Sequence, residues 1–198
     1  AKYLYRLSKN KEAAALLAPL WQNPPRTGLS IYDVAVTKAQ AAIDRKDLPQ
    51  ARQEVEAGLA RLRELKLATQ QLDYVSAKLF VGEKKYDQAL AAYARCCTTT
   101  IGIAPSETVV REVRAMFSQT IQEKKLAEAQ AIFQGLANWQ IDPMVPALME
   151  AQWASAAGDT ARARTAVTRC RQELKRFYGP NKEAFEKEIA AVEASLGH

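Results

Sequence analysis

The sequence predicts an all-α protein, and three observations support this prediction. The 198 residues include only 8 glycines and 8 prolines, which is few for the many turns of a β-sheet protein. Alanines recur at a nearly constant interval, and each is followed one helical turn later by a larger apolar residue. The last segment, residues 182–198, repeats apolar residues at helical spacing with charged residues between them.

The recurring alanines mark a repeat of 34–40 residues. A period of this length predicts an array of hairpins, each made of two antiparallel helices. Twelve positions before most markers lies another alanine, on the preceding helix, and short polar turns such as DRKD and GEKK separate the two. The markers are Ala13, Ala51, Ala89, Ala129 and Ala163, followed four positions later by Leu17, Val55, Tyr93, Phe133 and Val167; the upstream alanines are Ala39, Ala77 and Ala151.

Close packing of the two helices explains why alanine recurs. Two helices approach closely only where the residues in contact are small, and alanine is small without the backbone cost of glycine. We therefore expect these alanines to be buried inside their hairpins. Phe117 occupies the upstream small site before Ala129, and so large a side chain is expected to push that hairpin apart or rotate it.

This pattern resembles the tetratricopeptide repeat (TPR). The best match covers Asp73 to Cys97, where Ala77, Phe80, Ala89 and Tyr93 stand at matching sites, and Pro25 and Pro143 resemble the prolines that end such repeats. The resemblance implies an α-α superhelix, a right-handed solenoid of antiparallel helical hairpins, closed by a C-terminal capping helix. It divides a single helical-repeat domain, 1–198, into a partial repeat (1–27), repeats 28–66, 67–105, 106–143 and 144–178, and a cap (179–198).

The two ends of the chain are predicted to differ. The first repeat has too few residues for a complete first helix, so we expect the chain to be a segment of a longer protein. At the C-terminus, an amphipathic helix is expected to cover the apolar side of the last hairpin, as the end of a repeat array requires. Its apolar side consists of Phe185, Ile189, Val192 and Leu196.

Residues suited to catalysis are scarce, and the sequence predicts no enzymatic activity, cofactor or metal site. The single histidine, His198, is the last residue. The adjacent Cys96 and Cys97 would point about 100° apart on a helix and so would not hold a metal together. With Cys170 they are expected to be buried free thiols. No glycine-rich phosphate-binding loop is present.

The TPR resemblance also indicates a binding surface. In this family the first helices of the hairpins line a concave groove that binds a protein or peptide. Tyr74 and Arg114 are expected to be exposed there and to contribute most to binding, because tyrosine and arginine dominate binding hot spots. The resemblance implies that the following residues line the groove: Val36, Gln40, Tyr74, Lys78, Arg111, Arg114, Ser118, Leu148 and Gln152.

A basic stripe in the last repeat suggests an alternative. Arg162, Arg169 and Arg176 recur every seven residues and therefore share one side of a helix. Such a stripe could bind nucleic acid or another polyanion. We instead expect the whole basic run of this helix to pair with glutamates of the terminal helix, namely Glu183, Glu186, Glu188 and Glu193, or to form a solvated face; the run consists of Arg162, Arg164, Arg169, Arg171, Lys175 and Arg176.

Together these patterns predict a non-catalytic scaffold that binds another protein or peptide, as part of a larger assembly or secretion complex. The alternative is a binder of nucleic acid or polyanions. The net charge of +6 permits an acidic partner without requiring one. No apolar run is long enough to cross a membrane. The free cysteines favour the cytoplasm, and the periplasm is the alternative if a signal sequence has been removed.

Overall fold

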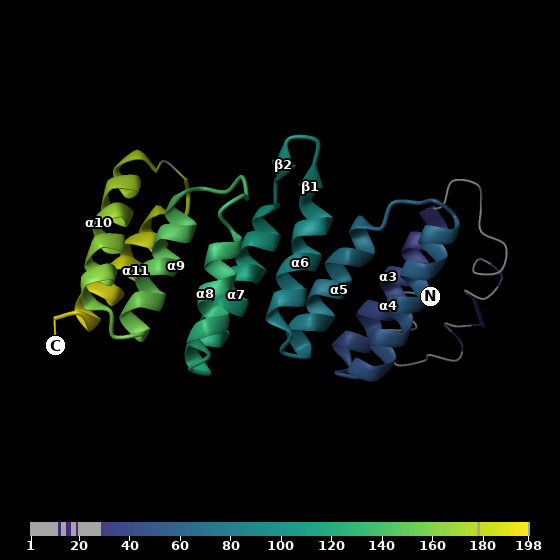
Figure 1. Ribbon diagram of the computed structural model, residues 1–198. Helices are drawn as coiled ribbons and strands as arrows, with labels where there is room; N and C mark the ends of the chain where they lie inside the picture. The colour runs from purple at the N-terminus through teal and green to yellow at the C-terminus, as the bar shows by residue number, and fades with distance from the viewer. Residues whose placement is uncertain (1–11, 13–14, 17–18, 20–28, 178, 198) are drawn as a thin grey trace. The chain divides into compact units, whose positions relative to one another are not determined.

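The computed structural model describes residues 29–177 and 179–197, together with the separate positions 12, 15, 16 and 19. These residues are mainly helical, which confirms the prediction of an all-α fold (Figure 1). The chain divides into two compact units, Ala1–Cys97 and Thr98–His198. None of the described helices is both long enough and apolar enough to span a membrane. The predictions made for Ala13, Leu17, Pro25 and His198 lie outside the described residues.

The first unit contains two pairs of helices among its described residues. Helix α3 (Leu29–Asp44) packs on α4 (Leu48–Glu64), and α5 (Gln70–Gly82) packs on α6 (Tyr86–Cys97). Helix α5 also contacts α3 and α4, so the two pairs share one apolar core. Val55, Leu62 and Leu72 are among the residues at its centre.

The second unit repeats this arrangement and adds a final helix. Helix α7 (Glu107–Gln122) packs on α8 (Leu126–Gly135), and α9 (Met144–Ala156) packs on α10 (Thr160–Arg176). Helix α9 contacts α7 and α8 as well. The last helix, α11 (Lys182–Ser195), lies against both α9 and α10 and buries Phe185, Ile189 and Val192. An amphipathic C-terminal helix on the last pair was predicted from these three residues and Leu196; the structure confirms the helix, which ends one residue before Leu196.

The packing alanines are buried as predicted. Seven of them are completely inaccessible to solvent: Ala39, Ala51, Ala77, Ala89, Ala129, Ala151 and Ala163. Phe117 is also buried, at 1% exposure. Its helix α7 makes less extensive contact with α8 than the helices of the other three pairs make with each other. The large Phe117 side chain at the contact and the short length of α8 together explain why α7 and α8 contact each other less.

The turn inside each pair has the same three-residue geometry, with a left-handed residue in the middle. That residue is a lysine in three turns, Lys46, Lys84 and Lys124, and Gly158 in the fourth. The amide of the next residue then bonds to a carbonyl five residues back, as Lys85 N does to Phe80 O at 2.9 Å. This is the hydrogen bond that ends many helices, usually with glycine at the left-handed position. The sequence analysis did not anticipate lysine there.

A short β-ribbon interrupts the helices between α6 and α7. Strand β1 (Thr98–Thr99) pairs antiparallel with β2 (Gly102–Ile103), and Gly102 has φ +142°, a conformation that favours glycine. The amide of Gln140 bonds to Ile103 O at 2.7 Å and ties the ribbon to the segment before α9. The β-branched residues of this stretch explain the strands.

The buried alanines give a first testable prediction. Replacing Ala89 with leucine should lower the free energy of unfolding by about 1–3 kcal/mol, because the extra atoms must enter a filled contact between α5 and α6. Ala91→Leu on the same helix is the matched control, since Ala91 is exposed. Chemical denaturation followed by circular dichroism measures both. Equal midpoints for the two variants would contradict the packing role of Ala89.

Candidate functional site

Three of the predicted binding residues meet on the first unit. Gln40 lies on α3, and Tyr74 and Lys78 lie on α5. Lys78 Nζ donates a hydrogen bond to Gln40 Oε1 at 3.1 Å and lies 6.0 Å from the centre of the Tyr74 ring. We call this cluster the α3–α5 face. Val36, one turn before Gln40, is partly buried and packs against the apolar core.

Tyr74 is more enclosed than the sequence analysis expected. Its side chain is half-buried and packs edge to face on Tyr93, with ring centres 6.0 Å apart. Tyr93 belongs to the core at 1% exposure. The expectation of a freely exposed Tyr74 is therefore wrong, and its removal would disturb the packing of α5 on α6.

The corresponding residues of the second unit are engaged by α11. Arg114 on α7 donates to both carboxylate oxygens of Glu188, at 2.7 and 2.6 Å, and Gln152 on α9 donates to the same carboxylate at 3.1 Å. The Arg114 guanidinium also lies 5.2 Å from the centre of the Phe185 ring. Arg114, Ser118 and Gln152 form what we call the α7–α9 face. The expectation of a freely exposed Arg114 is wrong, because Glu188 and Phe185 of α11 contact it and leave its side chain 28% exposed.

The remaining predicted residues behave differently from one another. Leu148 is 0% exposed, so the expectation that it contacts a ligand is wrong. Helix α9 buries seven of its thirteen residues between its neighbours, as an almost wholly apolar helix must.

Arg111 is exposed and forms no ion pair with any residue that the structure describes. It lines a pocket of about 480 Å³ beside the start of α11. Ser118 lines a second pocket, of about 380 Å³, beside the end of α11.

The basic stripe is partly neutralised within the second unit. Arg162 Nε donates to Glu150 Oε1 at 2.8 Å, and Arg169 forms an ion pair with the same carboxylate. Arg162 also stacks 4.8 Å from the centre of the Trp153 ring. The predicted pairing with the terminal helix is wrong for these two arginines. It is confirmed for Arg171 of the same basic run, which reaches Glu193 at 3.0 and 2.5 Å.

Hydrogen bonding to arginine controls the protonation of these carboxylates. Burial acts to raise the pKa of Glu150, but the hydrogen bonds from Arg162 and Arg169 outweigh it and hold that pKa below its usual value. The hydrogen bond from Arg171 likewise lowers the pKa of the exposed Glu193. A depressed carboxylate pKa contributes stability at neutral pH that is lost as the pH falls. The carboxylates of Glu150 on α9 and Glu193 on α11 are therefore ionised at neutral pH and form ion pairs with the arginines of α10.

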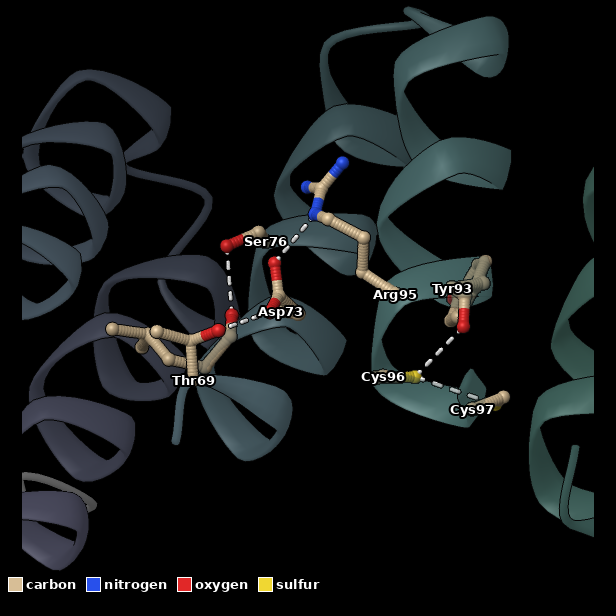
Figure 2. Close-up of polar contacts among 8 residues, drawn as sticks. Thr69, Asp73, Ser76, Tyr93, Arg95, Cys96 and Cys97 are labelled. Carbon is tan, nitrogen blue, oxygen red and sulfur yellow. Dashed lines mark hydrogen bonds and ion pairs between the residues drawn. The ribbon is translucent and has the colours of Figure 1, made fainter. Parts of the chain in front are cut away.

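A second polar cluster lies between α5 and α6 (Figure 2). The buried Asp73 accepts hydrogen bonds from Arg95 Nε at 2.9 Å and from Thr69 Oγ1 at 2.7 Å. These bonds satisfy a carboxylate that would be costly to bury alone. The arrangement joins the two helices of the pair and presents no unpartnered acid or base.

The thiols of Cys96 and Cys97 lie at the end of α6, next to this cluster (Figure 2). Their sulfur atoms are 3.5 Å apart, so the expected angle of about 100° between neighbouring side chains on a helix does not keep the two thiols apart. Burial, followed by the hydrogen bond with Cys97, raises the pKa of Cys96 to about 12, and burial raises the pKa of Cys170 to about 11. No group of three or more potential metal ligands occurs among the described residues.

Two features of the site lay beyond the sequence reasoning. Glu188 was considered only as a partner for the stripe, whereas it binds Arg114 and Gln152. Glu150 was not considered at all, although it lies twelve positions before Arg162. The contact alanines of a hairpin show the same separation of twelve residues. This spacing could therefore have predicted that Glu150 faces Arg162.

Comparisons of the chain with protein-family models, with curated proteins and with solved structures gave no match.

The Cys96 environment gives a second prediction. A rise in pKa from 9.0 to about 12 lowers the thiolate fraction near neutral pH, and so the rate of alkylation, by about a thousandfold. Iodoacetamide labelling of the native chain at pH 7.5, quantified by peptide mass spectrometry, measures that rate. The same chain in guanidinium chloride is the control. Equal rates in the two conditions would contradict the predicted shift.

Proposed function

We propose that this chain is a non-catalytic scaffold that binds another protein, within a larger assembly or secretion complex. We further propose that its helix pairs stack as a right-handed, TPR-like superhelix. The observation that carries the proposal is the α3–α5 face, where Gln40, Tyr74 and Lys78 gather on two adjacent helices.

The chemistry of this face suits the recognition of a polypeptide. Lys78 offers a cation, Gln40 an amide and Tyr74 an aromatic ring with a hydroxyl group. Each is partly accessible. The lysine is already positioned by its hydrogen bond to Gln40 and by the tyrosine ring. A side chain positioned before binding loses less conformational entropy when the partner arrives.

Polyanion binding remains the alternative function, through α10. Arg164, Lys175 and Arg176 are exposed and form no ion pair with any residue in the described part of the chain. Against this, Glu150 occupies Arg162 and Arg169. A polyanion complex would weaken steeply as salt is added, whereas a contact centred on one lysine and one tyrosine would weaken much less.

Charge reversal on the α3–α5 face tests the proposed function. Lys78→Glu should reduce capture of protein partners from the native host by about tenfold, the effect of a hot-spot residue. Arg63→Glu is the matched control. It makes the same charge change at an exposed position on α4 that forms no ion pair with a described residue. Cross-linking followed by quantitative mass spectrometry measures the capture, and circular dichroism checks that both variants fold.

Two results would count against the proposal. The first is that no protein is captured reproducibly by the parent chain. The second is that the Lys78 and Arg63 variants lose partners equally, which would indicate a general effect of charge. Binding of a random-sequence oligonucleotide, measured by fluorescence anisotropy at two salt concentrations, would then identify the α10 alternative.

A further inference from the structure

Helix α11 packs on α9 and α10, and it reaches Arg114 of α7 through Glu188 and Phe185, as a helical ligand would. The Glu188 carboxylate takes hydrogen bonds from Arg114 on α7 and from Gln152 on α9, so a single acidic group contacts both helices. Phe185, three residues earlier, packs beneath the Arg114 guanidinium. The face is therefore built to hold a carboxylate and an aromatic ring carried one turn apart on a helix.

Charge extends this complementarity to the rest of α11. Helix α11 carries four glutamates and two lysines, whereas α10 carries six basic residues and one glutamate. Arg171 of α10 binds Glu193 of α11 through two hydrogen bonds. The buried residues of α11 alternate in a simple pattern with the two glutamates that pair with other helices. Apolar residues stand at 185, 189 and 192, and acidic residues at 188 and 193.

The contact between α11 and the rest of the unit is loosely packed. The side chains of the Arg114–Glu188 pair keep 28% and 34% of their exposure, and those of the Arg171–Glu193 pair keep 41% and 40%. Pockets of about 480 and 380 Å³ flank the helix near its two ends. Ion pairs this accessible contribute little free energy, so α11 is held mainly by its three buried side chains.

We propose that the α7–α9 face is a docking site for an acidic amphipathic helix of a partner protein, and that α11 is a displaceable occupant of that site. The partner helix carries the pattern of α11, with apolar residues at positions i, i+4 and i+7 and acidic residues at i+3 and i+8. The inference rests on the proposed protein-binding function and names the class of partner for the second unit. It does not involve the α3–α5 face.

A reversible covalent lock tests whether α11 must move. The hydroxyl oxygens of Ser155 on α9 and Ser195 on α11 lie 2.8 Å apart, so Ser155→Cys with Ser195→Cys places two thiols within reach of each other. The probe is a fluorescent synthetic peptide with the sequence of residues 180–197, added to the full chain. Fluorescence anisotropy should show binding to the reduced double variant and none to the oxidised one. The reduced and oxidised samples share one sequence, so folding differences between variants do not enter.

Weakening the resident contact should favour the added helix. Glu188→Ala in the chain removes the carboxylate that holds Arg114 and Gln152, and the affinity for the unaltered peptide should rise about threefold or more. Glu186→Ala is the matched control, because Glu186 is exposed on the same helix and forms no ion pair with a described residue. A peptide carrying Glu188→Ala should bind more weakly than the unaltered peptide.

Three outcomes would overturn the inference. One is the absence of peptide binding to both the reduced double variant and the Glu188→Ala chain at millimolar concentration. Another is equal binding to the oxidised and reduced forms, which would locate the peptide elsewhere. The third is a disulfide that forms between two copies, with dimers seen by light scattering. In that case α11 of a second copy is the occupant. None of these results bears on the Lys78→Glu experiment, so the two proposals fail separately.

Discussion

The close approach of paired helices is the constraint on which the other features depend. The contact alanines have no exposed surface, so nothing larger fits between the helices of a pair without moving them. This contact also fixes the rotation of each first helix. Gln40, Lys78, Ser118 and Gln152 each directly follow a buried contact residue, namely Ala39, Ala77, Phe117 or Ala151. The polar side chains of both candidate faces are therefore positioned by the same packing that holds each pair together.

The sequence was sufficient for features that depend on local periodicity. The all-α class, the buried alanines and the amphipathic last helix all follow from residues a few positions apart. Features that depend on distant contacts were missed or mistaken. Arg114 and Glu188 are 74 residues apart, and Leu148 is buried because four other helices contact α9. The left-handed lysines were missed for another reason: glycine or asparagine is the usual signal for that conformation.

The two units use equivalent positions in different ways. In the first unit, the residues after the contact alanines bond to each other, Lys78 to Gln40, across α3 and α5. In the second unit, Gln152 instead bonds to a carboxylate brought by α11. Residue type explains the difference. By helix order Ser118 takes the place of Gln40 and Gln152 takes that of Lys78, and the short serine side chain forms no hydrogen bond with Gln152 among the described residues. The hydrogen-bonding capacity of Gln152 is then available for Glu188.

The turns described above separate the parts of the chain that tolerate changes in length from those that do not. All four turns within pairs contain three residues, at 45–47, 83–85, 123–125 and 157–159. In each turn, the amide of the third residue donates a hydrogen bond to the carbonyl five residues earlier. One added residue would break this bond and shift the contact between the alanines of the two helices. The connectors between pairs differ in length, at residues 65–69, 98–106 and 136–143, and of these only the first carries such a bond, from Leu67 N to Leu62 O at 2.8 Å. Among homologues of this chain, insertions and deletions should therefore accumulate in the connectors 98–106 and 136–143, while the four turns keep their length.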